Sequence, residues 1–268
     1  MTFGRARTAA AGTQFKPSNA VIARAPRLFA LVFSASVAML AGMTCAAADI
    51  YVMESSVPGM RAGARLADNE TLTLPAGGHI RAVLPSGKTQ TIRGPFSGKV
   101  SDLSKGVASN ESLMDPVRKI LETGGSRETS TGGTRSVAAK GQRPRGFSLV
   151  EVPAWVNGRV CVLKGGNVVL ARQSTAGAER AVLVDGKSFE RAQVTWEAGN
   201  ATAAWPASLK LQPDGTYQVL VQDREGRDVT LRLLDKAPDE DDMLIELHKL
   251  GCTHQLETWL RERMAGRG

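Results

Sequence analysis

Alternating apolar and polar residues, separated by turn-forming clusters, are the feature that most constrains the fold of this chain. Residues 71–95, TLTLPAGGHIRAVLPSGKTQTIRGP, contain three such stretches, with Pro-Ala-Gly-Gly and Pro-Ser-Gly-Lys between them. A period of two is typical of strands with one buried face, and Gly and Pro favour tight turns. We therefore predict antiparallel strands in this part of the chain.

Residues 147–238 show the same pattern again. The stretch RVCVLKGGNVVLAR predicts a hairpin that turns at residues 165–167, and the following stretches contain Asp-Gly and Glu-Gly turns. Six or so short strands at such intervals favour a sandwich over a parallel sheet. A sandwich of this kind is usually a binding or structural module.

Two segments carry helical patterns. In residues 110–123, Asn110 is a candidate cap for a helix whose apolar side chains recur with a 3.6-residue period. In residues 239–264, an acidic run is followed by two apolar faces, and Gly251 separates them. This pattern predicts a helical hairpin whose joint is Gly251-Cys252-Thr253.

The fold class that follows is mainly β with a C-terminal helical hairpin. We expect two small, sandwich-like β-rich units, at residues 49–123 and 147–238, followed by the hairpin at 239–264. Residues 124–146 contain almost no large apolar side chains and cannot bury themselves, so they predict a disordered, flexible linker between the units.

Residues 1–48 have the three parts of a secretory signal peptide. A basic flank precedes an apolar run from Leu28 to about Met43, and residues 46–48 fit a small-residue cleavage site before Asp49. The apolar run is short for a membrane span, which needs about 20 residues. We expect an exported, periplasmic protein with this signal cleaved. An uncleaved anchor, a transit peptide and lipidation of Cys45 are the alternatives.

The turn motifs of residues 70–95 also resemble a known family. Leu-Pro-x-Gly at residues 74–77, Leu-Pro-Ser-Gly at 84–87 and Gly-Pro at 94–95 are similar to the turns of FecR-type β-rich domains in exported bacterial proteins. The resemblance implies an envelope β-domain that acts as a sensor or scaffold part. It supplies no catalytic residues.

The formal net charge of +8 depends on where the basic residues lie. Residues 1–48 contain five basic and no acidic residues, so 29 basic and 26 acidic residues remain in the rest of the chain. A nucleic-acid-binding domain clusters its Lys and Arg residues on one surface, and the remaining sequence shows no such cluster. We expect a protein or another cell-envelope component as the partner and no nucleic acid. The oligomeric state is unknown.

The stretch HKLGCTH, residues 248–254, gathers two histidines and a cysteine. His248, Cys252 and His254 offer three candidate ligands for a metal, but Gly251 interrupts the helical face and no further Cys or His pair completes four ligands. A reactive thiol at a helix start is the second alternative. The stretch has no C-x-x-C motif, and we predict neither a metal site nor a catalytic residue here.

A disulfide is the better interpretation of Cys252. Removal of the signal takes Cys45 away, which leaves Cys161 and Cys252, an even number in an oxidising compartment. Their bond would fasten the helical hairpin to the second β-rich unit. Two free buried thiols remain the alternative.

No catalytic or dinucleotide-binding motif is present, so we expect no cofactor. The stretch WEAGNATAAWP places Trp196 and Trp205 at the ends of a candidate ligand loop, although tryptophans of small sandwiches more often belong to the core. The resulting prediction is a non-catalytic envelope protein acting as a binding, sensor or scaffold module. The alternative is a periplasmic enzyme acting on cell-wall or sugar polymers.

Overall fold

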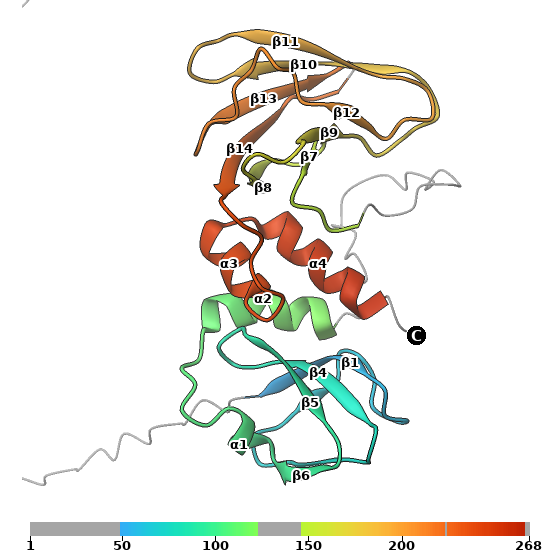
Figure 1. The fold of residues 1–268 in the computed structure, drawn as a ribbon, viewed down its shortest axis with the longest axis vertical. Helices are drawn as coiled ribbons and strands as arrows, with labels where there is room; N and C mark the ends of the chain where they lie inside the picture. Colours follow the sequence, from blue (N-terminus) through green and yellow to red (C-terminus); the bar gives the residue numbers. More distant parts are fainter. Residues whose placement is uncertain (1–48, 123–145, 223, 266–268) are drawn as a thin grey trace, which may run out of the picture. The chain divides into compact units, whose positions relative to one another are not determined.

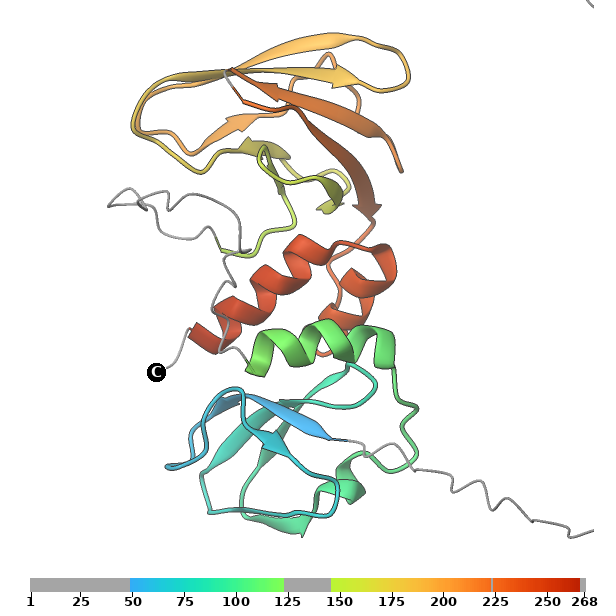
Figure 2. The ribbon, with the colours of Figure 1, turned by 180° about the vertical axis from the view of Figure 1, so that it is seen from behind.

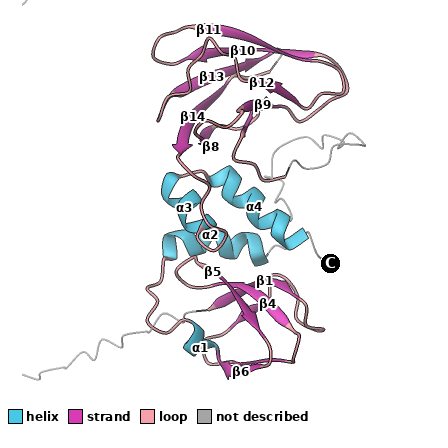
Figure 3. Cartoon of the chain, in the orientation of Figure 1, coloured by secondary structure: helices cyan, strands magenta, loops and turns pink. Residues whose placement is uncertain are grey.

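A computed structural model describes residues 49–122, 146–222 and 224–265, which belong to one compact unit. The predicted signal peptide at 1–48, and the predicted linker at 124–146 except for Gly146, lie outside the described residues. The described chain is mainly β, and its last two helices pack as a hairpin (Figure 1; Figure 3). This confirms the mainly β fold class with a C-terminal helical hairpin.

The N-terminal strands form a four-stranded antiparallel sheet and a two-stranded ribbon. The sheet order is β2 (Arg65–Leu66), β1 (Ile50–Ser55), β4 (His79–Val83) and β5 (Thr89–Arg93), while β3 (Thr71–Leu74) pairs with β6 (Phe96–Lys99). A turn with Gly87 at φ +86° closes the β4–β5 hairpin. Strand β3 pairs with β6 instead of with β4, the next strand along the chain. The alternating apolar residues nevertheless all face the core: Leu72, Leu74, Ile80 and Ile92.

A short helix α1 (Val100–Leu103) leads to helix α2 (Glu111–Glu122). The Asn110 side chain accepts a hydrogen bond from the backbone N–H of Leu113 at 3.3 Å, which confirms Asn110 as the cap. Helix α2 buries the predicted apolar stripe together with a methionine: Leu113, Met114, Val117, Ile120 and Leu121.

The C-terminal strands form two sheets with a common core. The larger sheet has the order β11 (Arg191–Trp196), β10 (Glu179–Asp185), β13 (Thr216–Val221), β14 (Arg227–Leu234) and β8 (Gly158–Leu163). The smaller has the order β12 (Thr202–Ala204), β9 (Val169–Ala171) and β7 (Glu151–Pro153). Residues of both sheets contribute to one hydrophobic cluster, which includes Val152 and Leu170 from the smaller sheet and Leu183 and Leu231 from the larger.

The predicted hairpin between β8 and β9 is wrong. A turn does form after Leu163, but it carries the chain from one sheet to the other, because β8 pairs in parallel with β14 while β9 pairs with β12 and β7. Residues 149–150 lie between the two strands. The Leu163 N–H donates to the Leu149 carbonyl at 2.7 Å, and the Val169 N–H donates to the Val150 carbonyl at 2.9 Å.

Helices α2, α3 (Met243–Leu250) and α4 (Thr253–Ala265) pack together (Figure 1; Figure 2). Helix α4 contacts α2 and β1 as well as β8, so its core is shared by both sets of strands. The predicted attachment to the second unit is thus only part of what the hairpin contacts. Among the described residues, no helix combines the length and the apolar character that crossing a membrane requires.

The loop between β10 and β11 depends on one carboxylate. Asp185 Oδ1 accepts hydrogen bonds from the backbone N–H groups of Ser188 at 2.9 Å and Lys187 at 2.8 Å. These two bonds lower the pKa of Asp185 below its ordinary value of 3.8. Because the folded pKa is the lower one, the stabilisation is present above the unfolded pKa and is lost as the pH falls through the folded pKa.

We therefore expect the carboxyl carbon of Asp185 to titrate with a midpoint below 3.8 in a carbon-detected NMR titration of the folded protein. A midpoint for Asp185 at or above its ordinary value would contradict this role of the loop hydrogen bonds.

Candidate functional site

The HKLGCTH stretch forms the joint between α3 and α4. Gly251 ends α3 in the left-handed conformation, with φ +74°, and its N–H donates to the carbonyl of His248. The Cys252 N–H donates to the Leu247 carbonyl at 2.8 Å. This pair of bonds is the Schellman motif. A Cβ atom at Gly251 would lie 2.7 Å from a guanidinium nitrogen of Arg159 on β8, so the joint also lies close against the sheet.

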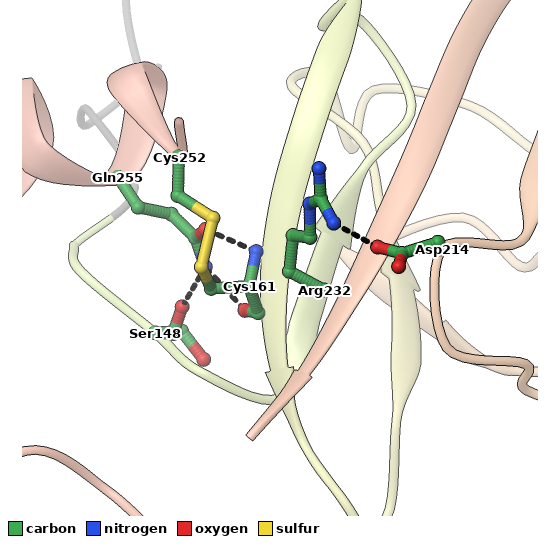
Figure 4. The surroundings of a disulfide bond; sticks show 6 residues. All are labelled: Ser148, Cys161, Asp214, Arg232, Cys252 and Gln255. Carbon is green, nitrogen blue, oxygen red and sulfur yellow. Dashed lines mark hydrogen bonds and ion pairs between the residues drawn. A yellow bond between two sulfur atoms is a disulfide. The ribbon is translucent and has the colours of Figure 1, made fainter. Parts of the chain in front are cut away.

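The structure joins Cys161 and Cys252 in a disulfide (Figure 4). Cys161 lies in β8 and Cys252 immediately precedes α4, with their Cα atoms 5.9 Å apart and both side chains fully buried. The bond attaches the helical joint to an edge strand of the larger sheet. On β14 beside it, Arg232 forms an ion pair with Asp214.

Gln255 completes the junction with three hydrogen bonds. Its Oε1 accepts from the backbone N–H of Cys161 at 2.6 Å, and its Nε2 donates to the carbonyls of Cys161 at 2.7 Å and Ser148 at 2.8 Å (Figure 4). The buried amide thus binds the edge of β8 as a neighbouring strand would, which satisfies polar groups that would otherwise be buried without partners. The cysteine and histidine pattern of this stretch did not point to Gln255. Its position one turn after Cys252, beside Leu256 on the apolar face of α4, was the available signal.

The other members of the HKLGCTH stretch have separate partners. His248 Nε2 lies 3.1 Å from the hydroxyl of Ser112 on α2, and the His254 ring meets the Trp155 ring edge-on with centroids 6.2 Å apart. Within the described ranges, no three His, Cys, Asp or Glu side chains come together in an arrangement that could hold a metal ion. The geometry therefore assigns Cys252 a structural bond.

The acidic run before α3 attaches the hairpin to the N-terminal sheet. The guanidinium of Arg81 on β4 lies 3.2 Å from the Glu240 carboxylate and 2.9 Å from that of Asp241. The Thr89 N–H donates to the Asp241 carbonyl at 2.9 Å. Arg263 on α4 also pairs with Glu240, at 2.7 Å. The hairpin is therefore connected to β4 and β5 by polar contacts and to β8 by the disulfide and Gln255.

The two tryptophans of the candidate ligand loop do not form an exposed aromatic pair. Trp196 is fully buried, and its indole N–H donates to the Leu170 carbonyl at 3.0 Å. Trp205 is partly buried, donates to the Leu209 carbonyl at 2.8 Å and meets Tyr217 edge-on. The expectation of a ligand contact does not hold for Trp196. Every second side chain of β11 from Val194 onward faces the core, and the Trp196 ring is one of them. The Leu170 carbonyl there accepts the hydrogen bond of its indole N–H.

Two adjoining grooves lie at one end of the C-terminal sheets. The first, of about 320 Å³, is lined by Trp155 and polar residues that include Gln173, Ser174, Arg224, Glu225 and Arg227. The second, of about 270 Å³, shares Ser174 and Arg224 with the first and is also lined by Arg172 and Glu179. Each groove has one carboxylate in its lining.

Arg172 holds the loops beside these grooves in place. Its side chain is 3% exposed, and the guanidinium donates to the carbonyls of Gly177 at 2.6 Å, Glu197 at 2.8 Å and Asn200 at 2.8 Å. It also lies over the Trp196 ring, 5.9 Å from the centroid. One side chain thus fixes two loops, at residues 173–178 and 197–201. The sequence pattern did not reveal Arg172, because two of its three carbonyl partners lie 25 and 28 residues away along the chain.

Replacing Arg172 by methionine is expected to lower the free energy of unfolding by about 3 kcal/mol, because hydrogen bonds from a charged donor contribute about 1.5 to 3 kcal/mol each and part of this is regained through water. Urea denaturation would measure the change. Arg191→Met, at an exposed position on β11, is the matched control and should change stability by less than about 0.5 kcal/mol. Equal effects of the two substitutions would show that Arg172 does not hold the loops.

No protein-family model matches the chain, and neither a curated protein nor a solved structure shows significant similarity to it.

Proposed function

We propose that this protein is an exported, non-catalytic component of a bacterial cell envelope that binds or holds another envelope component. The observation that carries the proposal is the buried bond between Cys161 and Cys252. Structural disulfides persist in oxidising compartments such as the periplasm and are rare in the cytosol. The secretory pattern of residues 1–48 and the FecR-like turns of residues 70–95 support the same assignment.

The arrangement of the helices supports a binding or scaffold role. The hairpin of α3 and α4 shares a core with β1 on one side and β8 on the other, so two β-rich parts are held by a common set of contacts. Such an arrangement presents surface loops of both parts from a fixed support. An enzyme acting on wall or sugar polymers is the second candidate, and it would have to use Glu225 and Glu179, the carboxylates in the linings of the two grooves.

Expression of the full chain in a Gram-negative host, followed by fractionation and intact-mass analysis, tests the proposal. We expect the protein in the periplasmic fraction, with Asp49 as its first residue if the signal is cleaved, and with a mass lower by two hydrogen atoms than that of the reduced form. Replacing three residues of the apolar run, Leu28, Leu31 and Val32, by aspartate provides the control and should retain the protein in the cytosol. Cytosolic accumulation of the wild-type chain with free thiols would overturn the proposal.

A further inference from the structure

We propose that the two grooves at the end of the C-terminal sheets form a binding site for a sugar that carries a carboxylate. This inference rests on the proposed binding function and specifies its ligand class. The site combines the partly buried Trp155 with the guanidinium groups of Arg224 and Arg227 and with the polar side chains of Gln173 and Ser174. The two grooves have volumes of about 320 and 270 Å³. These volumes are close to the lower end of the range for small-molecule sites, roughly 300 Å³.

Trp155 provides the apolar part of the site. The C–H groups on one face of a pyranose ring are weakly apolar and pack on an indole, while the rim of the indole remains in contact with water. His254 meets Trp155 edge-on, and His254 lies two residues after Cys252. The first turn of α4, attached to β8 by the disulfide, therefore contributes to the orientation of the Trp155 ring.

The arginines account for the negative charge of the ligand. A guanidinium has five N–H donors in a planar arrangement that suits a carboxylate. Arg224 is 46% exposed and lies 2.6 Å from the Glu179 carboxylate. Arg227 is 34% exposed and lies 3.5 Å from Glu225, whose side chain is 82% exposed. An exposed pair of this kind contributes little to stability, so a ligand carboxylate can replace Glu225 at little cost.

Gly177 and Glu179, in the wall of the second groove, are held in position before a ligand binds. The carbonyls of Gly177, Glu197 and Asn200 are fixed by the buried guanidinium of Arg172, and Glu179 lies between Arg172, at 3.8 Å, and Arg224. A site built on ordered loops loses less conformational entropy on binding. The carboxylates of Glu179 and Glu225 also offset much of the positive charge, which disfavours a polyanion such as nucleic acid and favours a ligand with isolated acidic groups.

Titration of the isotope-labelled full chain, followed by the indole N–H signals, tests this inference. One pair of probes is galacturonic acid, which carries a single carboxylate, and its neutral counterpart, galactose. The other pair is the disaccharide of N-acetylglucosamine and N-acetylmuramic acid and its neutral counterpart, diacetylchitobiose. We expect saturable shifts of the Trp155 signal, assigned by its loss in Trp155→Phe, with at least one acidic probe and at least about tenfold weaker binding of the neutral partner.

Variants separate the proposed contacts from nonspecific charge. Arg224→Gln and Arg227→Gln should each weaken binding of the acidic probe by about tenfold, whereas Arg191→Gln, on the exposed surface of β11, should leave it unchanged. Binding of only one acidic probe identifies a uronate or a muramic acid as the source of the carboxylate.

Three results would overturn the inference. They are equal binding of acidic and neutral probes, spectral shifts that do not include the Trp155 signal, and no binding by either acidic probe. These measurements use the purified chain, so they can fail while export succeeds. Export can likewise fail while binding holds.

Discussion

Replacing both Cys161 and Cys252 by alanine is expected to lower the free energy of unfolding by about 4 to 5 kcal/mol. The bond joins residues 91 positions apart, and the loop-entropy estimate for a closed loop of that length has this magnitude. Besides lowering the stability of the whole protein, the substitution should loosen the helices next to the bond. Amides of α3 and α4 should exchange faster with deuterium, while those of the β10–β11 hairpin should change much less.

Reduction of the wild-type protein provides a matched comparison for this prediction. Guanidinium denaturation with and without a reductant should give the same loss as the double substitution, and the reductant should not affect the doubly substituted protein. Cys161→Ala and Cys252→Ala alone should each resemble the double variant, because either one removes the bond. A double variant within about 1 kcal/mol of wild type would contradict the stabilising role of the disulfide.

Replacing Gln255 by methionine, which has a similar length, is expected to lower the free energy of unfolding by about 3 to 6 kcal/mol. The substitution leaves the N–H and the carbonyl of Cys161 and the carbonyl of Ser148 without their partner. An unsatisfied buried polar group costs about 1 to 3 kcal/mol. Thermal and urea denaturation under oxidising conditions would measure the change while the disulfide remains formed.

A neighbouring position supplies the control for Gln255. Glu257 lies two residues further along α4 and is only partly buried, so Glu257→Met should cost less than about 1 kcal/mol. We also expect Gln255→Met to accelerate exchange of the Cys161 amide even though the disulfide is intact. If that amide stays protected, Gln255 does not act as the neighbour of the β8 edge.

Local patterns predicted the elements of this fold better than their pairing. The strands follow from alternation and from turn residues such as Gly87, and the helical joint follows from Gly251, because these depend on residues close in sequence. The parallel pairing of β8 with β14, and the pairing of β3 with β6, bring together distant segments. Several arrangements would have buried the same apolar faces, so periodicity alone could not select among them.

The candidate sites likewise include some residues that the sequence could predict and others that it could not. Cys161 and Cys252 could be paired from their number and the expected compartment, whereas the partners of Gln255 and Arg172 are backbone groups that carry no sequence signal. Trp196 illustrates the opposite error. Its place beside a loop suggested exposure, but its alternation with Val194 along β11 was the better guide, since both side chains are buried.

The late position of α3 and α4 in the chain has a consequence for the order of folding. These helices supply apolar residues that complete a cluster begun by Tyr51, Leu113 and Cys161, all of them synthesised much earlier. The cluster therefore cannot close on a growing chain until residues 243–260 have emerged. Until then the earlier segments keep the apolar faces of this cluster accessible, which exposes the growing chain to chaperones.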